Sequence, residues 1–211
     1  MSQRVKIFVE GIADKTFLRQ YVNNAFNIQL TCDDIITTGG WQDIKSNTIV
    51  NQLKKNTADG GVNLVIFDAD SDVESRKAEL EQIKQEKNID FDLFLMPDNQ
   101  STGALEDLLE RIINPENQCV MDCWHRYEGD LKGQTIAWKI PTTPTSPAKK
   151  SMIYGYLEAL LGTSKSQKDL IKEKNRNYAD TNHWDLMSEA LQPLKSFLSS
   201  YLTDKKKTKG D

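Results

Sequence analysis

The chain has 211 residues and a formal net charge of −4 at pH 7; 38% of its residues are hydrophobic and 27% are charged. This composition excludes disordered and fibrous proteins and is ordinary for a globular protein with one main domain. The longest apolar runs are only a few residues, far too short to cross a bilayer, and the N-terminal segment lacks a signal-peptide pattern, so the sequence predicts a cytoplasmic protein without membrane contact.

The first half of the chain alternates short apolar runs with amphipathic segments, which is the pattern of βαβ units. Strands are predicted at residues 5–10, 34–37, 62–68 and 91–96. Helices are predicted between them, at residues 14–26, 41–53 and 74–87. The predicted fold class is therefore α/β, with a mainly parallel, Rossmann-like sheet flanked by helices.

The second half is less regular. A turn-rich loop leads into an amphipathic helix, "ALEDLLERII", which Pro115 closes. Residues 119–147 mix aromatics, glycines and three prolines and are predicted to be loop-rich, with a strand near 135–140. Helical periodicity returns in "KKSMIYGYLEALLG", where Gly162 is the predicted C-cap.

The last part combines a polar segment with a final helix. Residues 163–182 are highly polar and are expected to be mobile, whereas 184–202 carry an apolar helical stripe that Pro193 should bend or interrupt. The chain therefore divides into an α/β core at 1–115, a loop-rich and helical C-terminal extension at 116–202 that packs on the core, and a polar tail at 203–211.

The three cysteines, Cys32, Cys119 and Cys123, do not form an even disulfide framework and are predicted to be free thiols. A zinc site at Cys119, Cys123 and His125 was weighed, but the spacing is not Cys-x-x-Cys and no second pair follows. His125 and His183 are therefore predicted to be structural.

Acidic residues gather where two of the predicted strands end. They are Glu10 and Asp14 around the first strand, and Asp68, Asp70 and Asp72 after the third. Because parallel strands end at one edge of the sheet, where ligands bind, these carboxylates are expected to converge. Their repulsion at neutral pH costs roughly several kcal/mol unless protons or a cation intervene. Magnesium suits an all-carboxylate set, and the sequence therefore predicts a Mg²⁺ site, with Mn²⁺ able to substitute.

Other interpretations of these acids were tested against the sequence. An Asp after a strand is often only a helix cap, and Asp72 in particular could cap the helix that starts near residue 74. An EF-hand loop would need Gly where Val73 stands. A haloacid-dehalogenase phosphatase also has Asp-x-Asp after a strand, but it expects Thr or Val where this chain has Asp72.

Two segments together, "IFVEGIADKTFLRQYV" and "LVIFDADSD", resemble the Toprim domain of primases, topoisomerases and the overcoming-lysogenization-defect (OLD) nucleases. In that family a Glu ends the first strand and an Asp-x-Asp pair ends a later one. "STGALEDLLERI" resembles the Gly-x-x-Glu-Asp helix of OLD-type and small stand-alone bacterial Toprim-like proteins, and "AKKSMIYGYLEAL" resembles their downstream Lys helix. The resemblance spans residues 5 to about 160, and "WDLMSEALQPLKSFL" is similar to the closing helix of the stand-alone group.

The resemblance implies roles for the acids. Glu10 would be a general acid/base or a metal ligand, and Asp14 would match the acid that follows the family's Gly. Asp68 and Asp70 would bind the first magnesium ion, and Asp72 matches a further acid that some members use.

It also implies a second set of residues. Glu106 and Asp107 resemble the extra carboxylates with which OLD nucleases hold a second ion, as two-metal cleavage requires; they could equally be the polar first turn of a helix. Lys150, or equally Lys149, would stabilise charge on the transferring phosphate, and a solvated helix start is the alternative.

Three glycines are further candidates for substrate binding. Gly11 follows the strand-ending Glu, and Gly39 and Gly40 resemble the family's mid-motif Gly, although they could simply form a turn before Trp41.

The implied function is a Mg²⁺-dependent phosphodiester enzyme, first of all a DNA or RNA nuclease, in phage defence or DNA repair. The alternative is a non-enzymatic or partner-dependent module that works with a separate ATPase, since the chain has no G-x-x-x-x-G-K-[ST] loop. Nucleic acid is the expected partner, although the basic residues are scattered along the sequence.

Overall fold

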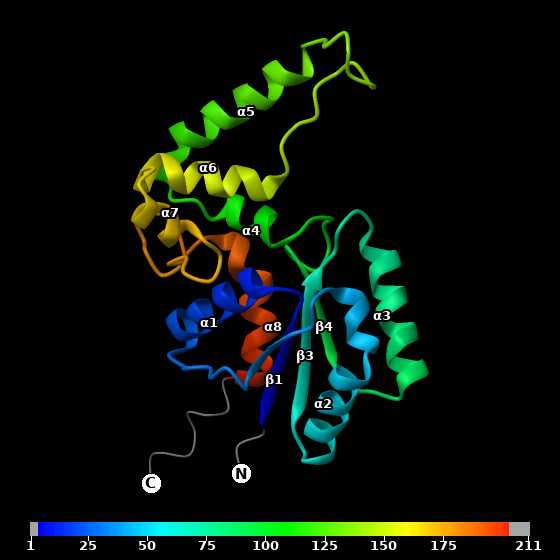
Figure 1. Cartoon of the computed structure of the whole chain (residues 1–211). Helices are drawn as coiled ribbons and strands as arrows, with labels where there is room; N and C mark the ends of the chain where they lie inside the picture. Colours follow the sequence, from blue (N-terminus) through cyan, green and yellow to red (C-terminus); the bar gives the residue numbers. More distant parts are fainter. Residues whose placement is uncertain (1–3, 203–211) are drawn as a thin grey trace.

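Four strands form one sheet in the order β2-β1-β3-β4. The structure is a computed structural model, and it describes residues 4–202. The strands are β1 (Val5–Val9), β2 (Ile35–Thr37), β3 (Val62–Asp68) and β4 (Asp92–Met96). All three neighbouring pairs are parallel, so the strands end at the same edge of the sheet (Figure 1). The α/β, Rossmann-like fold class is thereby confirmed, and each strand lies within one residue of its predicted bounds.

Helices cover both faces of this sheet because both faces are apolar. The helices of the first half are α1 (Ile12–Phe26), α2 (Asn47–Ala58) and α3 (Val73–Lys87). Successive strand side chains point to opposite faces. Ile7 and Val9 therefore join the core under α1, whereas Phe8 joins the core under α2 and α3. The predicted helix at 41–53 is instead a 3₁₀ turn, η1 (Trp41–Lys45), followed by α2.

The second half adds helices that extend the core under α1. They are α4 (Leu105–Arg111), η2 (Pro115–Asn117), α5 (Gln118–Lys132), α6 (Lys149–Leu161) and α7 (Lys165–Ile171). They are followed by η3 (Glu189–Leu191) and α8 (Gln192–Leu202). Gly162 is the C-cap of α6, as predicted. Trp184 is fully buried and lies in the same cluster as the α1 face of the sheet, so the C-terminal segments share one core with the strands.

The prediction of a loop-rich 119–147 is wrong for its first half, which belongs to the helix α5. The predicted strand near 135–140 is also wrong, because within residues 4–202 that stretch is loop. The helix α5 is amphipathic, but it buries only Met121. Residues 133–148 form a loop in which the Ile136 amide donates to the Thr142 carbonyl at 2.8 Å, and Trp138 and Ile140 are exposed.

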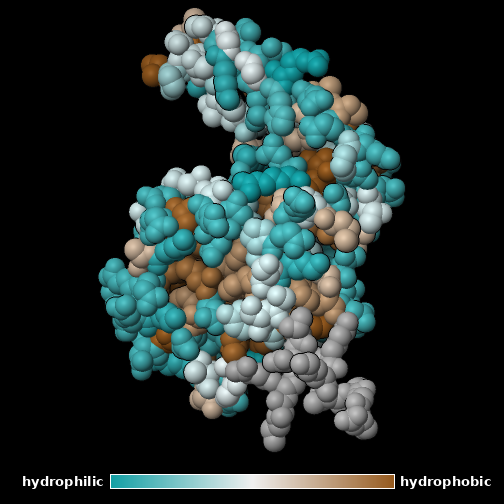
Figure 2. Space-filling model, turned by 180° about the vertical axis from the view of Figure 1, so that it is seen from behind, coloured by the Kyte–Doolittle hydropathy of each residue, from teal (hydrophilic) through white to brown (hydrophobic). Residues whose placement is uncertain are grey.

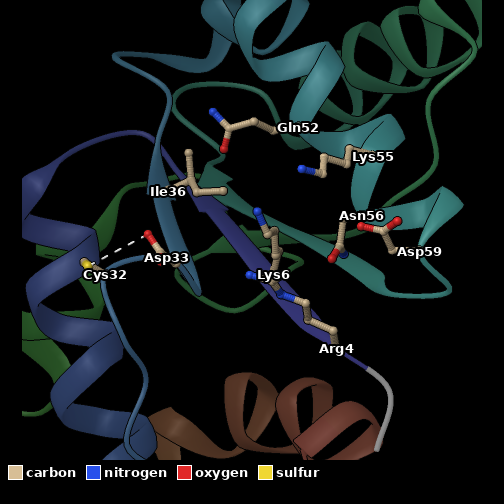
Figure 3. A pocket seen from close by; sticks show the side chains of 9 residues that line it. All are labelled: Arg4, Lys6, Cys32, Asp33, Ile36, Gln52, Lys55, Asn56 and Asp59. Carbon is tan, nitrogen blue, oxygen red and sulfur yellow. Dashed lines mark hydrogen bonds between the residues drawn. The ribbon is translucent and has the colours of Figure 1, made fainter. Parts of the chain in front are cut away.

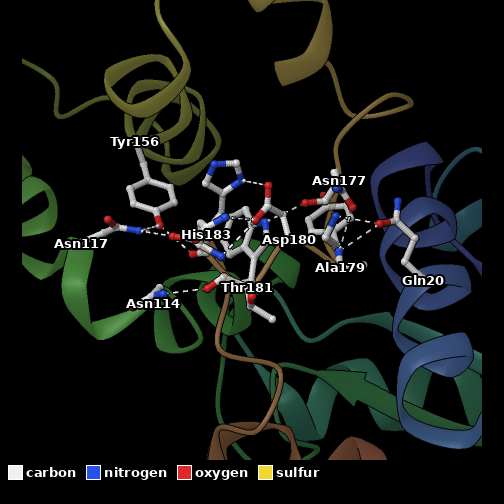
Figure 4. Close-up of polar contacts among 12 residues, drawn as sticks. Gln20, Asn114, Asn117, Tyr156, Asn177, Ala179, Asp180, Thr181 and His183 are labelled. Carbon is white, nitrogen blue, oxygen red and sulfur yellow. Dashed lines mark hydrogen bonds and ion pairs between the residues drawn. The ribbon is translucent and has the colours of Figure 1, made fainter.

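The polar segment expected to be mobile, 163–182, is tied to the core by side-chain amides. It begins with α7, and Figure 4 shows the network that follows. The Gln20 side chain bonds to the backbone of Arg176, Tyr178 and Ala179. Asn114 donates to the Thr181 carbonyl at 2.7 Å. Polar residues thus hold a segment that has few apolar anchors.

The final helix is shorter than the predicted 184–202. Residues 185–188 form a turn, η3 follows, and α8 starts at Gln192 with Pro193 as its second residue. Proline is tolerated in the first turn of a helix because an amide there has no intrahelical partner. Pro193 therefore marks the start of a helix rather than a bend within one.

Helices α5 and α6 and the loop 133–148 form a projection that we call the arm. The helix α6 packs on the core through its buried face, whereas the outer end of the arm stands clear of the α/β body with an open hollow beneath it (Figure 2). In Figure 1 the arm lies at the end of the molecule where β1 and β3 end. None of the helices in 4–202 is long and apolar enough to cross a membrane.

Candidate functional site

Four carboxylates meet at the carboxyl ends of the central strands. Glu10 follows β1, Asp68 ends β3, Asp14 lies in the first turn of α1 and Glu106 lies in the first turn of α4. They converge because β1 and β3 are parallel neighbours and because both helices begin at that edge. We call these four residues the acidic cluster.

Asp14 is buried, the other three members of the acidic cluster are half-buried, and their like charges repel one another. Burial and the charges of the other three members raise the pKa of Asp68 to about 9. Burial, and then the charges of Glu10 and Glu106, raise the pKa of Asp14 to about 7. The pKa of Glu10 is also raised, first by burial and then by the charge of Asp70. The cluster must therefore hold protons or a cation at neutral pH.

No basic side chain in residues 4–202 forms an ion pair with any of the four members. Arg76 lowers the pKa of Glu10 only through its charge, without contact. The charge of the acidic cluster is consequently not neutralised by the part of the chain that the structure describes.

Backbone amides occupy part of the cluster's oxygens. Glu10 uses both: Oε1 accepts from the Asp68 amide at 3.0 Å and Oε2 from the Trp41 amide at 3.2 Å. Asp68 Oδ1 accepts from the Leu105 amide at 3.0 Å. Glu10 therefore joins β1 to β3 and to η1, and Asp68 joins β3 to α4, which fixes where the remaining oxygens lie.

Asp14 and Asp107 occupy equivalent positions in α1 and α4. Asp14 Oδ2 accepts from the Gly11 amide and Asp107 Oδ2 from the Ala104 amide, each at 2.8 Å. In both cases the acid lies three residues after the N-cap and satisfies an amide that has no helical partner. Asp107 therefore matches the alternative in which it is a polar residue of the first helical turn. The carboxylate of neighbouring Glu106 accepts no hydrogen bond within 4–202 and belongs to the acidic cluster.

Asp70 faces a different partner. It has a left-handed backbone (φ 54°), and its amide and carbonyl both bond to Gly103, at 2.9 and 2.8 Å. Its carboxylate pairs with Arg76 of α3. Asp70 thus lies beside Glu10, close enough to raise its pKa, but is held by a cation.

Arg76 is a residue that the sequence interpretation missed. It is only 8% exposed, its guanidinium lies 3.9 Å from the centre of the Trp41 ring, and it also pairs with Glu79 at 3.1 Å. In the sequence, Arg76 stands less than two helical turns after the Asp-x-Asp segment, which could have identified it as a partner for Asp70. Because α3 is rich in charged residues, Arg76 looks there like an ordinary residue of a solvent-exposed helix.

Asp72 is the N-cap of α3. Its two oxygens accept from the amide and the hydroxyl of Ser75, at 3.0 and 2.9 Å, and these bonds lower its pKa. This is the geometry of a helix cap. Asp72 is exposed and is not part of the acidic cluster.

The two candidate lysines begin α6 and are both paired. Lys149 contacts Asp107 and Glu110, the latter at 3.0 Å, and Lys150 contacts Glu173. The charge of Glu106 also raises the pKa of Lys150, so Lys150 lies within electrostatic reach of the acidic cluster.

The candidate glycines shape two turns at the site. Gly39 and Gly40 have φ values of 96° and 141°, which favour glycine, and the Gly39 amide donates to the Glu10 carbonyl at 3.0 Å. They direct the chain so that the Trp41 amide reaches Glu10. Gly11 is the N-cap of α1.

A buried pair behind the cluster was also missed by sequence reasoning. Arg176 is 3% exposed, and its Nη1 donates to the Tyr178 hydroxyl at 3.1 Å. Burial raises the pKa of Tyr178 to about 12, and the charges of Asp14 and Glu106 act in the same direction. Both residues come from the segment expected to be mobile, where no periodic pattern marked them.

The donor set fits a hard divalent cation, but the side chains are not closed around one. As they are placed, no group of three or more His, Cys, Asp or Glu side chains in residues 4–202 could hold a metal ion. The oxygens without a hydrogen bond in that range are Asp14 Oδ1, Asp68 Oδ2, Asp70 Oδ1 and both of Glu106. All are carboxylate oxygens, which Mg²⁺ prefers. Side chains would have to move for three of them to hold one ion.

The zinc alternative has no support in the geometry. Cys32, Cys119 and Cys123 are exposed free thiols, as predicted, and His125 contacts Glu110 at 2.8 Å. His183 lies 3.6 Å from Asp180, and its carbonyl accepts from the Tyr156 hydroxyl.

Comparisons with known proteins identify a family without assigning an activity. Neither the curated proteins nor the solved structures contain a match to the chain. One family model matches residues 4–203, almost the whole sequence. The chain therefore belongs to the family described as "Protein of unknown function (DUF3226)".

Proposed function

We propose that the chain is a Mg²⁺-dependent enzyme that acts on phosphodiesters, first of all a DNA or RNA nuclease. One observation carries the proposal: four carboxylates, of which Asp14 is buried and the other three are half-buried, converge without an ion pair in 4–202 at the edge of a parallel sheet where ligands bind. A divalent cation would remove the repulsion that helps to raise the pKa values of Asp14 and Asp68. The resemblance to the Toprim domain supports the same site.

The residues divide into ligands and supports. Asp68, Glu106 and Asp14 have oxygens without hydrogen bonds and would hold the metal, while Glu10 keeps β1, β3 and η1 together. When bound, magnesium would stabilise charge on the phosphodiester oxygens. Asp70 would join the set if Arg76 released it.

The lysines of α6 supply positive charge at the other side of the cluster. Lys150 lies within electrostatic reach of Glu106, and Lys149 holds Asp107 and Glu110. Lys150 is the better candidate for contact with a phosphate, because Lys149 already contacts two carboxylates. The hollow beneath the arm leaves room for an extended substrate at this end of the molecule (Figure 2).

A partner-dependent module is the second candidate, and one observation favours it. Asp70 and Asp107 are each held by a cation, and no three-ligand metal group is formed within the described chain. A partner, such as a separate ATPase, could complete the site by moving Arg76 or the arm.

The test compares two isosteric variants in metal binding and in cleavage. Purified wild-type chain is assayed with Mg²⁺ and Mn²⁺ on single- and double-stranded DNA and on RNA. Asp68→Asn should abolish both Mn²⁺ binding, measured by electron paramagnetic resonance, and cleavage, whereas Asp72→Asn should leave both intact. Metal binding without cleavage would favour the partner-dependent candidate. Equal metal binding by wild type and Asp68→Asn would refute the metal site itself.

A further inference from the structure

A pocket of about 290 Å³ lies at the opposite end of the sheet from the acidic cluster. It lies between the start of β1, the loop before β2 and the last turns of α2 (Figure 3). Its polar lining residues are Arg4, Lys6, Asp33, Gln52, Lys55, Asn56 and Asp59. We call it the basic pocket, because three cations line it in a chain whose net charge is −4.

The three cations of the basic pocket are not neutralised by the described chain. Within residues 4–202, Arg4, Lys6 and Lys55 form no ion pair and donate no side-chain hydrogen bond. Figure 3 shows Lys6 and Lys55 extending from β1 and α2 into the same space. Like charges that are brought together without a partner favour the binding of an anion.

A buried amide oxygen in the same lining lacks a donor. Asn56 is 2% exposed, and its Nδ2 donates to the Val62 carbonyl and to Asn63 Oδ1, each at 3.0 Å. These two bonds fix the orientation of the amide. Its Oδ1 is left without a hydrogen bond in the part of the chain described. The oxygen lies against Gly61 and is itself buried, so it is an unpaired acceptor in the wall of the pocket.

We propose that the basic pocket binds a small phosphorylated molecule that also carries hydroxyl groups, such as a sugar phosphate or a mononucleotide. Arg4, Lys6 and Lys55 would hold the phosphate. The carboxylates of Asp33 and Asp59 would take hydroxyl donors. The volume lies near the lower end of the range for small-molecule sites, about 300–1,000 Å³, which suits a molecule of this size.

The alternation of charge argues against a continuous nucleic-acid backbone in this pocket. Asp33 and Asp59 stand beside the three cations and would repel successive phosphates. The C-terminal end of α2, where Lys55 lies, also has a negative dipole end. The phosphate must therefore be held by side-chain charges alone, so that loss of one lysine should have a large effect.

The experiment measures binding of four probes by isothermal titration calorimetry: inorganic phosphate, ribose 5-phosphate, adenosine monophosphate and ribose. The two phosphate esters should bind more tightly than inorganic phosphate, and ribose should not bind. Tighter binding of adenosine monophosphate than of ribose 5-phosphate identifies a nucleotide site, and equal binding identifies a sugar-phosphate site. If neither ester binds at millimolar concentration, or if ribose binds as well as its phosphate, the proposal is wrong.

Lys55→Gln and Lys54→Gln form a matched pair of variants. Both lysines are exposed on α2, but Lys54 does not line the pocket. Lys55→Gln should raise the Kd for the bound ester by about tenfold or more, since a charge-assisted hydrogen bond is lost, whereas Lys54→Gln should not change it. An equal effect of both variants would show non-specific charge attraction and overturn the proposal, as would binding of a short oligonucleotide with no binding of the esters. Circular dichroism of both variants checks that they remain folded.

Discussion

The two ends of the sheet differ in charge and in burial. At the carboxyl ends of the strands, the members of the acidic cluster are buried or half-buried, and Glu10, Asp14 and Asp68 have raised pKa values. At the amino ends, the cations of the basic pocket are at least partly exposed. The charges at both ends are favourable for the helix dipoles. Asp14 and Glu106 lie at the positive N-terminal ends of α1 and α4, and Lys55 lies at the negative C-terminal end of α2.

The difference shows where unfavourable free energy is concentrated. Water screens the exposed lysines and arginine, so their repulsion costs little. The acidic cluster has lost most of that screening, and mutual repulsion adds to the desolvation of its members. Only the acidic end should therefore respond strongly, in stability as well as in activity, to neutralisation.

The largest expected effect comes from Asp68→Asn. Asparagine keeps the acceptor for the Leu105 amide but removes a charge from the cluster. We expect loss of metal-dependent cleavage by about 100-fold or more, and a gain in stability on the order of 2 kcal/mol at pH 8 without metal. Chemical denaturation measures the second effect. A destabilised variant would contradict the buried repulsion, whatever its activity.

The second prediction concerns pH. Because the folded-state pKa values of Asp68 and Asp14 lie above the usual value near 4, the unfolded chain releases these protons at lower pH than the folded chain does. Stability without metal should therefore fall as pH rises from about 4 to about 9, with added Mg²⁺ offsetting the loss at the upper end.

The measurement is the melting temperature across this pH range, with Mg²⁺ and with a chelator. The chelated protein should show the steeper decline with pH. Identical curves would show that no cation binds to the acidic cluster.

A third, smaller effect is expected from Arg76→Met, which removes the ion pair to Asp70 but keeps much of the contact with the Trp41 ring. The expected cost is about 1–2 kcal/mol, because Arg76 is buried while Asp70 is half exposed. Release of Asp70 should also change the affinity for Mn²⁺. Lys77→Met is the matched control, since Lys77 is the next residue of α3 and, among the described residues, pairs only with exposed Glu74. Similar results for the two variants would show that Arg76 does not control Asp70.

The smallest effect is expected from Asp72→Asn. Asparagine caps a helix about as well as aspartate does, so stability should change by only a few tenths of a kcal/mol, whereas Asp72→Ala should cost about 1 kcal/mol. Cleavage and metal binding should be unchanged by Asp72→Asn. A loss of metal affinity in that variant would show that Asp72 takes part in metal binding together with the acidic cluster.

Much of the fold could be predicted because local patterns agree with the tertiary structure in the first half. Strands such as β3 are buried on both faces and therefore appear in the sequence as apolar runs. The helices between them have recognisable caps or apolar faces. Prediction failed in the arm, where α5 is amphipathic but is followed by a loop rich in prolines and glycines and buries only Met121. It failed again in 163–182, where only Ile171 and Tyr178 join the core and side-chain amides hold the rest.

The sequence by itself determined that acids follow β1 and β3 and begin α4, and that parallel strands would bring the first two groups to one edge. Only the tertiary structure decided how the acids are divided: Glu10, Asp14, Asp68 and Glu106 face one another, Asp70 is held by Arg76, and Asp72 caps α3. The physical reason is that strand order and alternation are local properties, whereas the direction of each carboxylate depends on amides and cations from elements far apart in the chain. The same reason explains the basic pocket, whose lysines come from β1 and α2 and carry no common motif.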